Sequence, residues 1–187
     1  MISAAAVAAA ALSAPAAAED WPQWRGPNRD GVSAESGWRT DWPEGGPPVL
    51  WKRDVGWGYA AVSVAGGRAF VLGNTGKADT VYCLDAATGR EVWKQPAMRN
   101  HMNACVLVDG HLYGFDGDER KSTKPRLACL SAKTGKVLWS RGGMGKGSLM
   151  AAGGRLIVLS ETGELSVGPA SPEGWRPLAR AQILKGT

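Results

Sequence analysis

The sequence predicts an all-β fold built from repeated four-stranded units, and two recurring phrases carry this prediction. The phrase LDAATGREVWK at residues 84–94 returns without a gap as LSAKTGKVLWS at residues 130–140, 46 positions later. A turn followed by a short apolar run occurs three times, with turn glycines at Gly67, Gly110 and Gly154. Self-similarity at this period indicates a repeat architecture. Beyond the first 18 residues no window has helical periodicity, so the repeats are expected to consist of strands.

The first 18 residues, MISAAAVAAAALSAPAAA, form an apolar, alanine-rich run without a charged side chain. Small residues at Ala16 and Ala18, directly before the first charge at Glu19, are typical of a secretory signal with its cleavage site. The basic residue that usually precedes such a run is missing. We expect residues 1–18 to be a signal peptide, and the protein to be exported to the periplasm or the extracellular space. An alanine-rich helix or a disordered tail is the alternative. The run is too short and too rich in alanine for a permanent transmembrane helix, and no integral membrane segment is expected.

Residues 19–48 are expected to form an N-terminal arm that precedes the repeats of residues 49–187. The arm contains four tryptophans: Trp21, Trp24, Trp38 and Trp42. Because large indole side chains contribute strongly when they are buried, these residues are predicted to hold the arm on the body.

The repeat region begins with VLWK at residues 49–52, which matches VLWS at residues 137–140. This match predicts an outer, fourth strand that arrives without the first three strands of its unit. Three complete units are expected to follow it.

Each complete unit is predicted to hold four short apolar strands separated by turn residues. The expected strand segments are residues 59–66, 68–74, 80–86 and 90–95 in the first unit, 103–110, 111–117, 126–132 and 136–141 in the second, and 147–154, 155–161, 163–169 and 175–184 in the third. In the third unit the tryptophan phrase is no longer recognisable.

The repeated phrase has the chemistry of a tight turn between two strands. Asp85 can accept hydrogen bonds from backbone N–H groups of the turn that follows it. Thr88 and Gly89 then close the turn, because Gly89 is free to take a positive φ. A hairpin is therefore predicted at this point of the first unit.

The second copy has Ser131, Thr134 and Gly135 at the equivalent positions, with Ser131 as a weaker version of the same cap. In the strand after each turn, side chains alternate between the two faces of the sheet. Trp93 and Trp139 are therefore predicted to be structural residues that dock an outer strand onto a neighbouring sheet.

Four-stranded units of this length are typical of β-propeller blades. The two long phrases resemble the pyrroloquinoline-quinone (PQQ) type propeller repeat, and WPQWRGPNRDGVS at residues 21–33 is similar to the opening of exported bacterial PQQ-like repeat proteins. The resemblance implies a β-propeller of four-stranded antiparallel blades like that of the quinoprotein alcohol dehydrogenases. Closed propellers use about 4 to 8 blades, so three units imply an incomplete, truncated propeller of about three blades.

Charge and cysteine content narrow the function classes. Lys and Arg number 22 against 17 Asp and Glu, a net charge of +5, but they are mixed with acids and lack aromatic interleaving, so no nucleic-acid partner is expected.

Cys83 and Cys129 occupy equivalent positions in two units and are expected to be small core residues. Whether they or Cys105 form a disulfide stays open, because a disulfide needs close Cα atoms.

No segment has the pattern of a catalytic or metal site. His101, Cys105 and His111 have suitable residue types for zinc, but their spacing is not a ligand pattern and favours strand and turn residues. FDGDE at residues 115–119 lacks the calcium-loop spacing, and GGMGKGS at residues 142–148 departs from the phosphate-loop pattern. Neither histidine lies in a nucleophile-elbow context.

The resemblance raises the question of whether the chain binds PQQ, since PQQ-dependent alcohol dehydrogenases share this repeat. For such an enzyme it implies an adjacent pair of cysteines, a catalytic Asp, calcium held by Glu, Asn and Asp, and a floor Trp. No two cysteines are adjacent here and no such grouping matches, so no cofactor is expected.

We therefore expect a non-catalytic, exported propeller module that acts as a protein-interaction or envelope-assembly scaffold. It would bind an unknown protein partner or self-associate through open blade edges. The alternative is a fragment of a quinoprotein-like dehydrogenase whose active blades lie outside this chain.

Overall fold

The computed structural model describes residues 19–37, 39–76, 78–99, 105–117 and 124–185. The predicted signal peptide at residues 1–18 lies outside the described residues, as do Trp38, His101, Asp118 and Glu119. Among the described residues no helix is long and apolar enough to cross a membrane.

Within this part of the chain, twelve strands form three four-stranded antiparallel sheets, and no helix is present. The first sheet contains β1 (Ser63–Ala65), β2 (Arg68–Asn74), β3 (Asp79–Asp85) and β4 (Glu91–Gln95). The second contains β5 (Val106–Val108), β6 (His111–Asp116), β7 (Arg126–Ser131) and β8 (Val137–Gly142). The third contains β9 (Gly147–Ala152), β10 (Arg155–Ser160), β11 (Glu164–Pro169) and β12 (Ala179–Gln182). The all-β prediction of four-stranded antiparallel units is confirmed.

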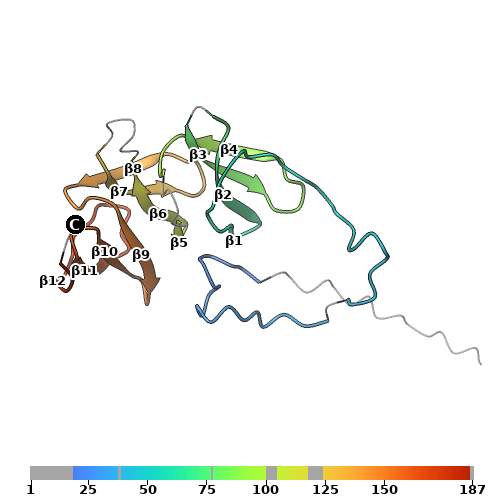
Figure 1. Cartoon of the computed structure of the whole chain (residues 1–187), viewed down its shortest axis with the longest axis horizontal. Helices are drawn as coiled ribbons and strands as arrows, with labels where there is room; N and C mark the ends of the chain where they lie inside the picture. The colour runs from blue at the N-terminus through green and yellow to red at the C-terminus, as the bar shows by residue number, and fades with distance from the viewer. Residues whose placement is uncertain (1–18, 38, 77, 100–104, 118–123, 186–187) are drawn as a thin grey trace, which may run out of the picture.

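The sheets follow one another in chain order (Figure 1). Contacts between described strands of different sheets join the first sheet to the second and the second to the third, through the inner strands β1, β5 and β9 and through β6. The first and third sheets have no such contact, so the three sheets form an open arc, as an incomplete propeller would. We call the face of a sheet that is turned toward the next sheet its outgoing face, and the opposite face its incoming face.

Apolar side chains from facing sheets make the core. Between the first and second sheets, Phe70, Leu72 and Cys83 pack against Leu112 and Leu130. The interface between the second and third sheets follows the same scheme, and its buried residues include Tyr113, Phe115, Leu127, Leu156 and Val158. Alternation along each strand directs one set of side chains to each neighbour, which is why both faces of the second sheet are apolar.

The N-terminal arm is attached to the inner edge of the first sheet. Trp21 pairs with Val64 of β1 through two backbone hydrogen bonds of 2.6 and 2.9 Å. The prediction that the other described tryptophans of the arm are pinned to the body is wrong, because Trp24 and Trp42 are 68% and 58% exposed.

The predicted outer strand at residues 49–52 is also wrong as a strand, since these residues belong to no ladder. A fourth strand needs a third strand beside it, and no sheet precedes this segment in the described chain. Trp51 and Val55 instead cover the incoming face of the first sheet, where they pack against Ala69, Tyr82 and Leu84.

Candidate functional site

The repeated turn of the first unit is held by its own side chains. The Asp85 carboxylate accepts hydrogen bonds from Thr88 N at 3.0 Å and from Thr88 Oγ1 at 2.8 Å. The Gly89 N–H donates to the Asp85 carbonyl at 2.8 Å, and Gly89 has a φ of 68°. The hydrogen bond from Thr88 is the main cause that lowers the pKa of Asp85, and nearby Arg68 acts in the same direction.

The second unit builds the same turn with a hydroxyl in place of the carboxylate. Ser131 Oγ accepts a hydrogen bond from Thr134 N at 3.3 Å, and Gly135 N donates to the Ser131 carbonyl at 2.8 Å. The φ of Gly135 is 73°. The longer contact to Ser131 fits a weaker cap than the one at Asp85.

Each of three tryptophans donates a hydrogen bond to the turn of the following sheet. Trp51 Nε1 lies 3.0 Å from the Ala86 carbonyl and Trp93 Nε1 lies 2.9 Å from the Ala132 carbonyl. Trp139 repeats the contact with Ser171 at 2.9 Å. Thus residues 49–52 keep the docking contact of an outer strand, although they form no strand.

The glycines of the turns make room for these indoles. A Cβ at Gly135 would lie 2.7 Å from the Trp93 ring, and one at Gly89 would overlap Trp51. Glycine is therefore required at both positions for two reasons: the backbone has a positive φ, and an indole ring lies where a Cβ would be. The third acceptor, Ser171, was missed from the sequence because its turn lacks the Thr-Gly pair.

The thiols that lie across the ladder from the docking tryptophans are buried. Cys83 pairs with Trp93 and Cys129 pairs with Trp139 in the strand register. Both are free thiols, and burial raises the pKa of each to about 11. Cys105 is also buried, with its Sγ 3.2 Å from Met98 Sδ. The described cysteines therefore serve as core residues and form no disulfide.

Of the residues considered as metal ligands, the structure describes Cys105, His111 and Asp116 but not His101, Asp118 or Glu119. Asp116 of the FDGDE segment is engaged by Arg99, with 2.7 Å between Asp116 Oδ1 and Arg99 Nε. His111 lies in β6, and no cluster of three potential metal ligands exists among the described residues. The glycine-rich segment at residues 142–148 joins β8 to β9.

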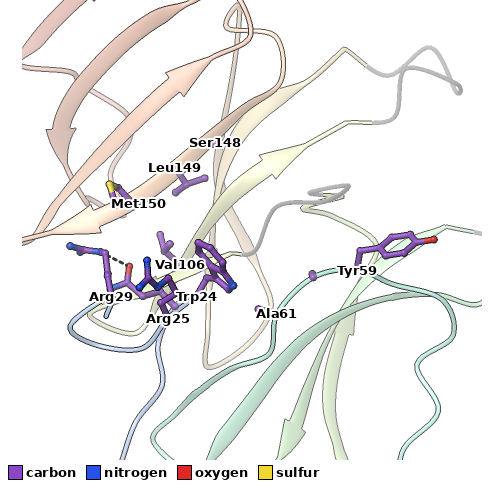
Figure 2. A pocket seen from close by; sticks show the side chains of 11 residues that line it. Trp24, Arg25, Arg29, Tyr59, Ala61, Val106, Ser148, Leu149 and Met150 are labelled. Carbon is purple, nitrogen blue, oxygen red and sulfur yellow. Dashed lines mark hydrogen bonds between the residues drawn. The ribbon is translucent and has the colours of Figure 1, made fainter. Parts of the chain in front are cut away.

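A cavity of about 620 Å³ lies between the N-terminal arm and the inner strands. Its walls come from the arm, from the residues before β1, and from β5 and β9; they are Gln23, Trp24, Arg25, Arg29, Tyr59, Ala60, Ala61, Val106, Ser148, Leu149 and Met150. Figure 2 shows the arm residues Trp24, Arg25 and Arg29 close to Val106, with Tyr59 farther along the same hollow.

The loop that carries the two arginines has an unusual backbone. Arg25 and Arg29 have φ values of 65° and 60°, a backbone region that residues other than glycine rarely adopt. Gly26 between them packs beneath the Trp21 ring, where a Cβ would lie 2.6 Å from the indole. The loop is thus bent tightly around Trp21, and the bend directs its side chains to the cavity.

The cavity lining is cationic and aromatic. The Arg25 guanidinium lies 5.9 Å from the centre of the Trp24 ring and donates to the Asp30 carbonyl at 3.1 Å. Arg29 Nε donates to Gln23 Oε1 at 3.3 Å, while Gln23 is itself buried. No Asp or Glu is among the lining residues, so the two guanidinium groups keep donors for an acidic ligand. The sequence does not indicate this site, because no pattern in it predicts the positive φ values of Arg25 and Arg29 that bend the loop.

Sequential four-stranded antiparallel sheets, joined by one docking tryptophan per step, define a repeat protein of the β-propeller class. The chain belongs to a PQQ-like repeat family: residues 30–123, just over half of its length, match the family model described as outer membrane protein assembly factor BamB. No curated protein sequence matches the chain.

One solved structure of low identity supports the fold, and two further ones are described with it for their similarity alone. The computationally designed Ika4 protein is 14% identical, with a TM-score of 0.56 over 75% of this chain and 82% of that one. The quinohemoprotein alcohol dehydrogenase ADHIIG from Pseudomonas putida HK5 is 23% identical, with a TM-score of 0.47 over 64% and 20%. BamB from Moraxella catarrhalis is 15% identical, with a TM-score of 0.33 over 71% and 51%. The chain spans only 15% to 37% of the length of several such structures.

The resemblance of the repeat phrases to those of PQQ-dependent alcohol dehydrogenases raises the question of a quinone and calcium site. Calcium takes oxygen ligands, mostly carboxylates and carbonyls. The cavity at the inner strands is lined by two arginines and no carboxylate. The described residues of this cavity therefore do not fit a calcium-bound quinone.

Proposed function

We propose that the protein is a non-catalytic interaction module of the cell envelope that binds an acidic segment of a protein partner. The observation that carries this proposal is the cavity that Trp24, Arg25 and Arg29 line together, with Tyr59 farther along it. Trp, Tyr and Arg are the residue types that most often dominate binding energy at protein interfaces. The name of the family model, an outer membrane protein assembly factor, supports a scaffold role of this kind.

The chemistry of the lining defines the partner segment. Guanidinium groups bind carboxylates by paired, charge-assisted hydrogen bonds. Val106, Leu149 and Met150 add an apolar floor beside them. An extended segment with an Asp or Glu next to an apolar side chain fits both features, and the net charge of +5 would favour its approach.

Peptide selection tests this proposal with a random library in place of the partner. Short random peptides displayed on phage would be selected on the purified protein, and we expect enrichment of Asp and Glu beside an apolar residue. Binding of the selected peptides should be lost in the double variant Arg25→Glu, Arg29→Glu. The matched control is Lys133→Glu, Lys136→Glu, an equal charge reversal at two exposed residues of the second turn. Equal loss of peptide binding in both double variants would mean that the net charge of the protein, and not the cavity, determines binding, and would contradict the proposal.

The competing proposal is that the chain is a fragment of a quinoprotein-like dehydrogenase. Incubation with PQQ and calcium, followed by removal of unbound ligand, separates the two functions. We expect no retained chromophore. A stoichiometric chromophore would contradict the non-catalytic proposal.

Export belongs to the same proposal, since an envelope scaffold must leave the cytoplasm. The alanine-rich residues 1–18 support it, and cleavage is expected near Ala18. The intact mass of periplasmic material should correspond to a chain that starts close to Glu19. A full-length cytoplasmic product would contradict export.

A further inference from the structure

The innermost strands β1, β5 and β9 each have one edge that pairs with no strand of their own sheet. Each of them ends in a two-residue turn that leads into the next strand. The pair that flanks such a turn is hydrogen-bonded, so the residue before it in the strand directs its backbone N–H and C=O outward, away from the sheet. The three equivalent outward residues are Val64, Leu107 and Ala151.

The N-terminal arm pairs with two of these three residues. Val64 exchanges backbone hydrogen bonds of 2.6 and 2.9 Å with Trp21. The next arm residue, Pro22, accepts a hydrogen bond from Leu107 N at 3.2 Å. The inner edges of these sheets therefore accept an extended segment through main-chain hydrogen bonds.

The inner edge of β9 has no such partner in the described part of the chain. The Glu161 N–H donates to the Lys146 carbonyl at 2.7 Å, which fixes the alternation along this ladder and makes Leu149 and Ala151 the outward residues. Neither residue makes an outward backbone hydrogen bond to a described residue. Ala151 is only 8% exposed, and an unpaired backbone group that is buried costs free energy.

This edge lies at the arginine cavity. Leu149 lines the cavity together with Arg25 and Arg29 (Figure 2). The arm makes no backbone hydrogen bond to β9, and it bends where the Gly26 N–H donates to the Gln23 carbonyl at 3.0 Å. The third inner edge is thus left unpaired by the arm, with two guanidinium groups beside it.

We propose that the acidic partner segment adds to β9 as a further strand at this inner edge. The inference rests on the proposed function and specifies how the segment is held. Main-chain hydrogen bonds to Leu149 and Ala151 fix the segment in an extended form, as in other peptides that add a strand to a sheet edge. Successive side chains of a strand point to opposite faces. A carboxylate can therefore meet Arg25 and Arg29 while its apolar neighbour packs on the other side.

Hydrogen exchange of backbone amides, measured by NMR on the full chain, tests this proposal with the acidic peptides selected on phage. In the free protein the Val64 amide should exchange slowly, because it donates to the Trp21 carbonyl at 2.9 Å, and the Leu149 amide should exchange faster. A saturating peptide should slow exchange at Leu149 by about tenfold or more and leave Val64 unchanged. Binding without a change at Leu149 overturns the strand pairing, while the proposed function stands. Failure to select any acidic peptide overturns both.

Backbone methylation of the peptide separates strand pairing from simple coverage of the edge. A methyl group on a backbone nitrogen removes its hydrogen-bond donor, and only every second residue of an added strand donates toward β9. Methylation at alternate positions should weaken binding by about three- to tenfold each, and methylation between them should leave it unchanged. An equal loss at every position, or no loss at any, overturns the proposal.

A substitution at Leu149 supplies the corresponding test on the protein. Leu149→Pro removes the outward N–H and keeps the ladder hydrogen bonds, since Leu149 and Val158 form a non-hydrogen-bonded pair. The matched control, Leu149→Ala, shortens the same side chain and keeps the N–H. The peptide should bind Leu149→Pro about three- to tenfold more weakly than Leu149→Ala. Equal affinity overturns the proposal, and if Leu149→Pro does not fold, the methylated peptides on the wild type decide the question.

Discussion

The outgoing faces of the first and third sheets have the same ladder register and opposite surroundings. In the first sheet, Phe70 and Trp93 lie with ring centres 5.9 Å apart beneath the second sheet. At the equivalent places of the third sheet, Ile157 is half-buried and Ala179 is exposed. The difference teaches that one strand pattern makes all three sheets, while the outer-strand tryptophan is found only in the two sheets whose outgoing face packs against a following sheet.

The largest expected effect concerns the closed interface. Trp93→Ala should reduce the free energy of unfolding by about 3 kcal/mol, at the low end for removal of a core tryptophan, because the indole is half-buried. It also loses the hydrogen bond to Ala132. Urea unfolding checks the change. Trp24→Ala, which removes a 68% exposed indole, is the control and should change the free energy by no more than about 0.5 kcal/mol. An unchanged urea midpoint for Trp93→Ala would show that docking contributes nothing.

A pair of glycine substitutions sharpens the same point. Gly110 and Gly135 both have a φ of 73°, but only Gly135 lies under an indole, with space for no Cβ. Gly110→Ala should cost about 1 to 2 kcal/mol for the left-handed backbone alone. Gly135→Ala should cost about 1 to 3 kcal/mol more, because the added methyl group displaces Trp93. Equal costs in urea unfolding would mean that the ring is free to move aside.

Much of this architecture follows from the sequence, since turn glycines and period-two apolar runs indicate the strands of all three units. Other features could not be predicted. Residues 49–52 match an outer strand in sequence, but pairing needs a neighbouring strand that the pattern itself does not supply. The bend at Arg25 and Arg29 uses a backbone region that is usually assigned to glycine. Open blade edges follow from the count of three units, but the residues on the third outgoing face are known only from the ladder register.

A smaller effect should distinguish the two repeated turns. The pKa of Asp85 is lowered in the folded protein from its ordinary value of 3.8, so its contribution to stability is present above that pH and is lost as the pH falls through the folded pKa. The turn at Ser131 has no titrating cap. Asp85→Ser should therefore flatten the dependence of stability on pH in the acidic range below about 4. Urea midpoints at several acidic pH values check this, and parallel curves for variant and wild type would contradict it.

The smallest expected effect is chemical. Because burial raises the pKa of Cys83 and Cys129 to about 11, few thiolates exist at neutral pH. Both cysteines should react slowly with a thiol reagent in the native protein and rapidly in denaturant. Fast native labelling at either residue would show that the interface beside it opens readily.

The contrast between the closed interfaces and the third outgoing face can be measured directly by methyl NMR with a soluble paramagnetic probe. In dilute protein, we expect the probe to broaden the methyl signals of Ile157, Leu159, Leu165 and Val167 and to leave those of Leu127 and Leu130 sharp. Sharp signals from Ile157, Leu159, Leu165 and Val167, or broadened signals from Leu127 and Leu130, would contradict the account.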